Sequence, residues 1–290
     1  MSRSNLFQLI LLAAIWGASF LFIRIGVPVF GPGKLIVLRV GLAALFLLGV
    51  ALWLKRDLAW RGNLRHLLFI GAFNSGIPFL LYAFAAQTLN ASLLSIINAA
   101  TPIFGALVVA IWLRVPLRSA AMLGLGLGFA GVLLIVGGNA GVHGNQGWIA
   151  TLAALCAPLC YALATSYTRK HASHIPAFAQ AHGSMWMAAL VALPLALAAP
   201  AGAAPQVGDW LAILALAVVC TGWAYLIYFR LITEIGPART LTVTFLIPVF
   251  GVLWGHLFLA EPVTLSMLAG GAIVLLGTAL ANGLIGPRGR

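Results

Sequence analysis

Uninterrupted apolar stretches of about 20 residues recur along the whole chain and constrain it more than any other feature. A helix needs about 20 residues to cross roughly 30 Å of hydrocarbon, and its backbone hydrogen bonds are satisfied internally. Only 7% of the 290 residues are charged, whereas 63% are hydrophobic, so charges are too few to cover a water-soluble fold of this size. The sequence therefore predicts an all-α integral membrane protein with ten transmembrane helices. Their expected ranges are 6–26, 34–54, 66–88, 91–112, 118–137, 147–168, 176–199, 209–230, 239–259 and 264–285.

Basic residues collect at one set of span ends. With the N-terminus inside, thirteen of the sixteen Lys and Arg residues fall on one side of the membrane, and Arg24, Lys34 and Arg39 are the remainder. Cytoplasmic loops carry the excess of Lys and Arg, so both termini are expected in the cytoplasm. The formal charge of +12 then reflects orientation, and no nucleic-acid partner is expected. The thirteen are Arg3, Lys55, Arg56, Arg61, Arg65, Arg114, Arg118, Arg169, Lys170, Arg230, Arg239, Arg288 and Arg290.

The two halves of the chain are similar to each other. A shift of 146 residues aligns Pro102-Ile-Phe-Gly with Pro248-Val-Phe-Gly, and a shift of 145 places Arg24 on Arg169. Shared prolines imply shared helix bends. We expect one five-helix repeat over 1–145 and a second over 146–290, which is inverted in the membrane because five is odd; this plan is typical of secondary transporters. The shift of 146 also pairs Tyr82 with Tyr228, Leu113 with Leu259, Pro116 with Pro262, Gly124 with Gly270 and Gly131 with Gly277.

Acidic side chains are absent from the middle of every predicted span. Proton-coupled carriers commonly use an intramembrane carboxylate as a relay. The sequence therefore favours passage of a substrate down its own gradient, or exchange. His182 and His256 leave a protonation mechanism open, although the sequence favours a structural, hydrogen-bonded role for both. The four acids are Asp57, Asp209, Glu234 and Glu261.

Amides, hydroxyls and aromatic rings remain to recognise a substrate. Asn74, Pro78 and Tyr82 share one face of the third predicted span, and Asn98 and Thr101 share one face of the fourth. A mainly apolar cavity with a few convergent polar groups is typical of a small-molecule site. Helix packing and lipid contact are the alternatives for these residues. The expected cavity residues are Trp16, Ser19, Asn74, Tyr82, Asn98, Thr101, Tyr161, Trp186, Trp223, Tyr225 and Thr244.

Prolines inside the spans are the expected hinges, because each removes a helix hydrogen bond and sets a bend. Arg24 and Arg39 are costly near lipid, so they either face the cavity mouth, where they would meet a carboxylate, or reach the outer surface. Tyr228 and Trp112, close to predicted span ends, are interpreted as interfacial anchors. The prolines are Pro78, Pro102, Pro158 and Pro248.

The segment Gly126-Leu-Gly128-Phe-Ala-Gly131 matches the dinucleotide pattern GxGxxG, but it lies in an uncharged span. Close helix packing is the better interpretation, and Gly124 and Gly270 fit the same role. No zinc-spaced cluster and no catalytic motif occurs in the sequence. We therefore expect no metal, no cofactor and no enzymatic activity.

A set of short motifs carries a family resemblance. They are Trp16-Gly17-Ala18-Ser19-Phe20, Arg39, Pro102, Pro248, Leu259-Ala-Glu261-Pro262 and the glycines from Gly270-Gly271 to Gly277. Together they resemble the ten-span EamA type of the drug/metabolite transporter superfamily over essentially the whole chain. The resemblance implies a carrier of the bacterial cytoplasmic (inner) membrane with a central cavity formed by spans one to four and six to nine. Carriers of this type are similar to exporters of amino acids and related metabolites.

The expected function is therefore secondary transport, as an exporter of amino acids or similar metabolites that alternates access around an uncharged cavity. Its expected partners are a small-molecule substrate and the lipid bilayer, and the expected state is a monomer or a weak homodimer. Two alternatives stay open: a proton-coupled transporter of nucleosides, sugars or drugs, and a channel whose cavity is open at both ends together.

Overall fold

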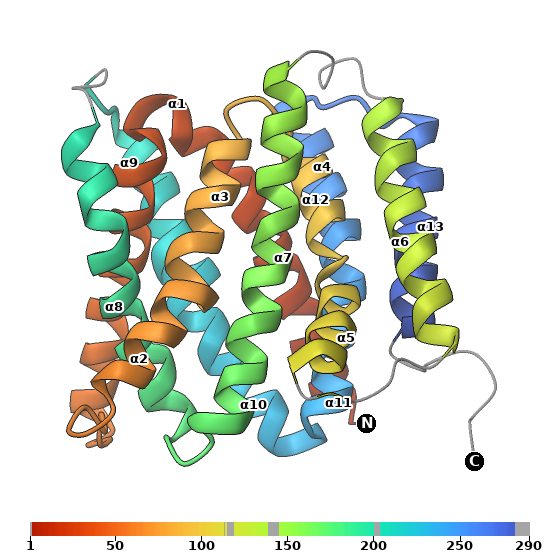
Figure 1. Ribbon diagram of the computed structural model, residues 1–290. Coiled ribbons are helices and arrows are strands. Elements are labelled where there is room, and N and C mark those ends of the chain that lie inside the picture. The colour runs from red at the N-terminus through yellow and green to blue at the C-terminus, as the bar shows by residue number, and fades with distance from the viewer. Residues whose placement is uncertain (1, 113, 115–118, 139–144, 200–203, 282–290) are drawn as a thin grey trace.

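The computed structural model describes residues 2–112, 114, 119–138, 145–199 and 204–281 (Figure 1). Within these ranges every regular element is a helix, as the sequence predicts, and there is no strand. Some predicted features lie outside the described residues: Leu113, Pro116, Arg118, Arg288, Arg290 and the last residues of the range 264–285. The elements are α1 (Arg3–Trp53), α2 (Leu64–Gly71), η1 (Ala72–Gly76), α3 (Ile77–Ala85), α4 (Ala91–Asn98), α5 (Thr101–Trp112), α6 (Ser119–Gly137), α7 (Asn145–His171), α8 (Ala177–Ala198), α9 (Val207–Leu214), η3 (Ala215–Trp223), α10 (Ala224–Ile235), α11 (Pro237–Thr240), α12 (Val243–Leu259) and α13 (Leu265–Ala281).

Seven helical stretches of the described chain are long and apolar enough to cross a membrane. Three of them join consecutive elements, since Leu64–Ala85 contains η1, Ala91–Trp112 contains α4 and α5, and Val207–Ile235 contains η3. The apolar helices α12 and α13 are shorter, at 17 residues each. Residues 239–242, predicted as the start of a span, instead belong to the short α11 and a turn.

Helix α1 covers 51 residues, although the sequence predicted two spans with a connection over residues 27–33. The structure confines the break to Gly31, whose φ of 68° and ψ of 163° suit glycine alone. Pro32 follows at once and disfavours helical backbone at the residue before it. The first part of α1 rises from the N-terminus to the upper edge of Figure 1, and the second part returns to the lower left. The chain therefore reverses direction at Gly31.

The helices form one bundle around α1, which contacts α8, α12, η3, α3 and α9. Most of the buried apolar side chains belong to a single cluster with members from α1, α3, α4, α7, α8 and α12. Helices α6 and α13 pack on each other at the right of Figure 1. Helices α10 and α12 pack against α1, and α7 packs against α3.

Glycines bring the backbones of α6 and α13 into contact. A Cβ at Gly131 would lie 2.7 Å from the carbonyl oxygen of Gly270, and a Cβ at Gly277 would lie 2.6 Å from that of Gly124. Such close approach is possible only for small residues. The interpretation as packing residues is confirmed for Gly124, Gly131 and Gly270, but not for Gly126, whose added Cβ would have nothing within 4 Å. The pairing is antiparallel, because the early glycine of each helix meets the late glycine of the other.

Two stretches depart from α-helical geometry in the same way. The residues of η1 and η3 form π-helical turns, and the shift of 146 places Ala72–Gly76 onto residues 218–222, inside η3. π-Helical turns within α-helices occur often at functional sites. In this protein both turns carry residues that line the cavity described next.

Candidate functional site

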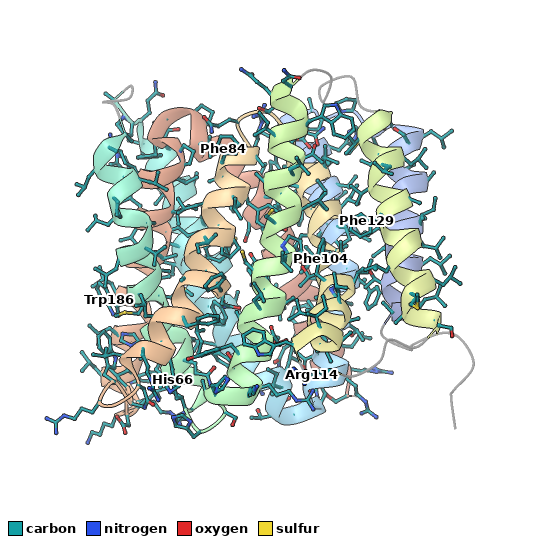
Figure 2. All side chains as sticks on the ribbon, viewed as in Figure 1. His66, Phe84, Phe104, Arg114, Phe129 and Trp186 are labelled. Carbon is teal, nitrogen blue, oxygen red and sulfur yellow. The ribbon has the colours of Figure 1, made fainter. Side chains whose placement is uncertain are left out.

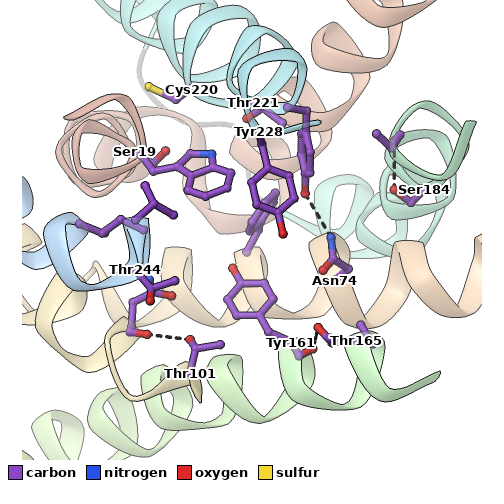
Figure 3. A pocket seen from close by; sticks show the side chains of 18 of the residues that line it. Ser19, Asn74, Thr101, Tyr161, Thr165, Ser184, Cys220, Thr221, Tyr228 and Thr244 are labelled. Atoms are coloured by element: carbon purple, nitrogen blue, oxygen red, sulfur yellow. Dashed lines mark hydrogen bonds between the residues drawn. The ribbon is translucent and has the colours of Figure 1, made fainter. Parts of the chain in front are cut away.

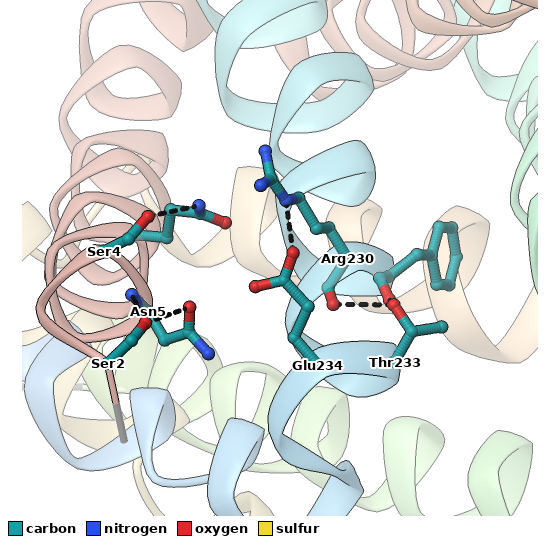
Figure 4. Close-up of polar contacts among 8 residues, drawn as sticks. Ser2, Ser4, Asn5, Arg230, Thr233 and Glu234 are labelled. Atoms are coloured by element: carbon teal, nitrogen blue, oxygen red, sulfur yellow. Dashed lines mark hydrogen bonds and ion pairs between the residues drawn. The ribbon is translucent and has the colours of Figure 1, made fainter.

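A cavity of about 560 Å³ lies inside the bundle (Figure 3). Side chains from α1, the α2–α3 stretch, α4, α5, α7, α8, η3, α10 and α12 line it. Pockets for small molecules usually measure about 300–1,000 Å³ and are mainly apolar with a few placed polar groups. Its lining includes Trp16, Ser19, Phe20, Ile23, Arg39, Ile70, Asn74, Phe79, Tyr82, Asn98, Thr101, Tyr161, Thr165, Thr168, Arg169, Gln180, Ser184, Cys220, Thr221, Tyr225, Tyr228, Phe229, Thr244 and Ile247.

The cavity reaches one face of the bundle. Its lining extends to Thr168, Arg169 and Gln180, near the ends of α7 and α8 at the edge of Figure 1 where the N-terminus lies. None of the described residues in the opposite turns, at 86–90 and 260–264, lines it. At the closed end the ring of Phe20 meets that of Tyr82 edge-on, with centroids 5.3 Å apart.

Nine of the eleven predicted cavity residues line this cavity. Asn74 donates a 3.1 Å hydrogen bond from Nδ2 to the hydroxyl of Tyr225, which joins η1 to α10. Tyr82 donates a 3.1 Å bond to Asn98 Oδ1, and Thr101 donates to the backbone oxygen of Asn98. The nine are Trp16, Ser19, Asn74, Tyr82, Asn98, Thr101, Tyr161, Tyr225 and Thr244. Their contact with a substrate stays a prediction.

Trp186 and Trp223 do not line the cavity, so their predicted placement needs correction. Trp186 donates a 3.1 Å hydrogen bond from its indole to Nε2 of His182, and Trp223 is 49% exposed on the outside of η3. Each follows a lining residue, Ser184 or Thr221, by two positions. Two positions along a helix correspond to roughly half a turn, so both tryptophans point away. The position of each tryptophan along its predicted span indicates its depth in the membrane but not the direction of its side chain.

The position of Tyr228 near a predicted span end indicates an interfacial anchor, but the residue lines the cavity. Its ring packs against that of Trp16, with centroids 5.3 Å apart at an angle of 48°. Tyr228 lies three residues after Tyr225 on the same helix face. This spacing could have identified Tyr228 as a cavity residue, but its proximity to a predicted span end favoured the interpretation as an anchor.

Arg39 is the main correction to the predicted uncharged cavity. Its side chain lines the cavity although the residue is only 4% exposed. The guanidinium donates from Nε to the Thr221 hydroxyl at 3.0 Å and lies over the Phe79 ring, 3.7 Å from its centroid. The sequence left its direction open, because an arginine near a span end can also reach the surface. Arg24 instead donates to the backbone oxygen of Ala86 outside the cavity.

All four acidic residues are engaged elsewhere. Glu261 is buried and accepts bonds from the backbone N–H of Ala91 at 2.7 Å and of Ser92 at 2.9 Å, and from the Ser92 hydroxyl. It thereby satisfies N–H groups at the start of α4 that lack partners within the helix. Because none of the described lining residues is acidic, the cavity contains no carboxylate. The other acids serve as follows: Asp57 accepts from Ala59, Asp209 caps α9, and Glu234 pairs with Arg230.

The histidines named as candidate protonation sites are hydrogen-bonded. His182 accepts from Trp186, and Nδ1 of His256 lies 3.0 Å from the backbone oxygen of Glu261. Neither lines the cavity. Both contacts suit the structural role that the sequence favours.

A family model for EamA-like transporters matches residues 4–137 and, a second time, residues 148–283. The chain belongs to the EamA-like transporter family. The resemblance inferred from its motifs is thus confirmed, and this EamA-like chain is a multi-pass membrane protein. The bundle and its cavity are accordingly those of a transporter.

Several proteins are similar to this EamA-like transporter. The uncharacterized transporter YvbV of Bacillus subtilis (strain 168) is 32% identical over 184 residues, which cover 59% of this chain and 56% of YvbV. Two uncharacterized transporters of Archaeoglobus fulgidus are 24% and 28% identical over 272 and 280 residues, and these matches cover more than nine tenths of each chain. A crystal structure with 21% identity superposes with a TM-score of 0.68 over 98% of both chains, which supports the fold alone.

Proposed function

We propose that this EamA-like protein is a secondary transporter that exports amino acids or similar small metabolites across the bacterial cytoplasmic membrane by alternating access. The observation that carries the proposal is the cavity of about 560 Å³, which both halves of the chain line and whose described lining extends to one face of the bundle and not to the opposite turns. A channel would need a path that is open at both faces together. Uniport or exchange suits the cavity, because it holds no carboxylate to relay protons.

The proposal includes ten spans arranged as two inverted five-helix repeats, over 1–145 and 146–290. The double match to the family model supports this plan. Helix α7 runs from the upper to the lower edge of Figure 1, opposite to the first part of α1 that it would repeat. Antiparallel repeats predict this reversal.

Reciprocal contacts support the same plan. A Cβ at Gly76 of the first half would meet Val191 of the second at 3.2 Å, and a Cβ at Gly222 of the second half would meet Phe46 of the first at 2.5 Å. A shift of 146 places Gly76 on Gly222, and a shift of 145 places Phe46 on Val191, so the two contacts correspond to each other in the repeat. The antiparallel glycine pairs of α6 and α13 behave alike. Such exchange is expected of two repeats related by an axis in the membrane plane.

Basic residues orient the proposed carrier. Figure 2 labels Arg114 near the lower edge, the edge at which the N-terminus lies, and Phe84 near the upper edge. The positive-inside rule then makes the lower face cytoplasmic. The cavity would be open to the cytoplasm, as an exporter loading its substrate requires.

The four prolines remain the proposed hinges, in two different settings. Pro78 is the second residue after η1, and Pro102 is the second residue after the break between α4 and α5 at residues 99–100. Pro158 and Pro248 lie inside the continuous helices α7 and α12. A missing hydrogen bond lowers the cost of bending at Pro158 and Pro248, whereas Pro78 and Pro102 adjoin stretches that already depart from α-helical geometry.

Uptake into proteoliposomes tests the proposed function. A mixed pool of labelled amino acids, nucleosides and sugars is offered without a pH gradient, and protein-free liposomes are the control. We expect saturable uptake of amino acids or similar metabolites that accelerates when the lumen is preloaded with the same compound. Uptake without saturation or acceleration would favour the channel, and accumulation driven by a pH gradient would contradict uniport. The absence of uptake from every class would remove the proposal.

A further inference from the structure

The charge inside the cavity narrows the chemistry of the substrate. Arg39 and Arg169 line the cavity, whereas none of the described lining residues is acidic. The chain has only four acids, and each interacts outside the cavity. The lining therefore carries positive charge that this chain does not neutralise.

Arg39 is placed to bind an anion. It is 4% exposed and lies within a predicted span, where an unpaired charge is costly and marks a functional site. Thr221 holds Nε at 3.0 Å and Phe79 supports the guanidinium face at 3.7 Å. Within the described residues this is the only hydrogen bond of the group, so its terminal nitrogens remain for a ligand. A guanidinium presents two parallel N–H donors to a carboxylate.

A second donor in the same cavity lacks an oxygen or nitrogen partner. The hydroxyl of Ser19 is buried in α1, close to Cys220, and forms no hydrogen bond to an oxygen or nitrogen of the described residues. A thiol is a weak hydrogen-bond partner, so this buried hydroxyl keeps the capacity to bind a ligand or a water. Nearby, the paired rings of Trp16 and Tyr228 offer an apolar surface to a flat group.

From these contacts we infer that the cavity selects small organic anions, in which one carboxylate binds Arg39 and an apolar, preferably aromatic, body lies against Trp16 and Tyr228. This inference rests on the proposed function and restricts its substrates to metabolites that carry a carboxylate and a net negative charge. Among metabolites of similar size, a monoanion is preferred over a zwitterion, because no carboxylate of the described lining receives an ammonium group. A neutral amide and a cation rank lower still.

Equilibrium dialysis of the purified full chain in detergent tests this preference without passive leakage through lipid. Four labelled probes share one phenyl ring and differ in charge: phenylacetate, phenylalanine, phenylacetamide and phenethylamine. Protein-free micelles correct for partitioning. We expect phenylacetate to bind about tenfold or more tightly than phenylacetamide, since charge-assisted pairs are the stronger ones. Equal or tighter binding of phenylalanine or phenethylamine overturns the inference.

Variants locate the effect. Arg39→Gln should remove the preference for phenylacetate, Arg39→Lys should keep part of it, and Arg61→Gln, at an exposed turn, should keep all of it. A preference that persists in Arg39→Gln overturns the site, and the comparison of probes on the unaltered chain needs no variant to fold. If no probe binds while the mixed pool yields transported nucleosides or sugars, the inference fails and transport stands. If, in addition, no compound of the mixed pool is taken up into proteoliposomes, the proposed function fails as well.

Discussion

The hydroxyl of Tyr82 donates a 3.1 Å hydrogen bond to Oδ1 of Asn98, across the closed end of the cavity. The repeat shift of 146 places Tyr228 and Thr244 at the corresponding positions, yet Thr244 donates to the backbone oxygen of Leu241 and no bond joins the two side chains. One half therefore makes a contact that the other half lacks. In a carrier with inverted repeats, the opposite state is expected to exchange the two arrangements.

Tyr82→Phe should shift the chain away from the conformation described here. The change removes one hydrogen bond that contributes about 0.5–1.5 kcal/mol, so the ratio of the two states falls roughly 2- to 12-fold. The measurement is the alkylation rate of a cysteine that replaces Thr168. A charged, impermeant maleimide is supplied on the face of the N-terminus, and we expect Tyr82→Phe to slow the reaction. The native cysteines are first replaced by Ala; they are Cys156, Cys160 and Cys220.

Tyr228→Phe is the matched control for that experiment. Tyr228 lacks the corresponding hydrogen bond in this conformation, so its loss should leave the alkylation rate unchanged or raise it. Equal slowing by both variants would contradict the exchange of contacts and indicate a general loss of packing.

Some of the cavity could be predicted from the sequence because polar residues recur there at helical spacing. Asn74 and Tyr82 lie two helical turns apart on one face, and both line the cavity. The direction in which a side chain points could not be predicted where its neighbours in the sequence are uniformly apolar. Trp223 sits among residues that would suit lipid or protein equally, so only packing decides that it points outward. Arg39 was ambiguous for a related reason, because its long side chain can extend in either direction.

Glu261→Ala should destabilise the fold. Three donors at the start of α4 lose their acceptor in a buried setting, and each unsatisfied donor costs about 1–3 kcal/mol. We expect a loss of about 3 kcal/mol or more, observed as a lower Tm in detergent. Glu234→Ala breaks only a partly exposed pair with Arg230, worth about 0.3–0.5 kcal/mol, and is the control. Equal Tm values for both variants would show that the cap contributes little.

The break in α1 shows a second limit of sequence reasoning. The spans 6–26 and 34–54 predict a connection over residues 27–33, which contains Pro28 and Pro32, but the helical backbone continues on both sides of Gly31. Pro32 lies in the first turn after the break, where its missing N–H has no partner to lose, whereas Pro28 lies inside the last turn before it. The lengths of the apolar stretches therefore predicted the two spans correctly, whereas the extent of the connection between them was overestimated.

Gly131→Ala should separate α6 from α13. The new methyl group would lie 2.7 Å from the carbonyl oxygen of Gly270 and 2.9 Å from N of Val274, and backbone atoms cannot rotate away. Overpacking of this kind costs about 1–3 kcal/mol. Gly126→Ala is the control, since nothing lies within 4 Å of its added Cβ. Thermal stability by fluorescence-detected size exclusion should fall for the first variant only; a loss in both would show that the contact with Gly270 is not its cause, because alanine favours the helix more than glycine does.

Asn74→Ala should weaken transport without lowering the amount of folded protein. Its side chain donates to Tyr225 from the opposite half of the chain, at 3.1 Å, and both residues line the cavity. Loss of this bond leaves the Tyr225 hydroxyl free to rotate in the site and costs about 1–2 kcal/mol, which lowers kcat/KM roughly 5- to 30-fold for the metabolite identified from the mixed pool. Trp223→Phe, on the outer face, should stay within about twofold of the unaltered chain, because it keeps an apolar ring there. Size exclusion of each variant measures the folded fraction. Similar kinetics for Asn74→Ala and the unaltered chain would place the substrate away from η1 and α10, whereas equal losses in both variants would trace the effect to packing of the bundle instead of the cavity.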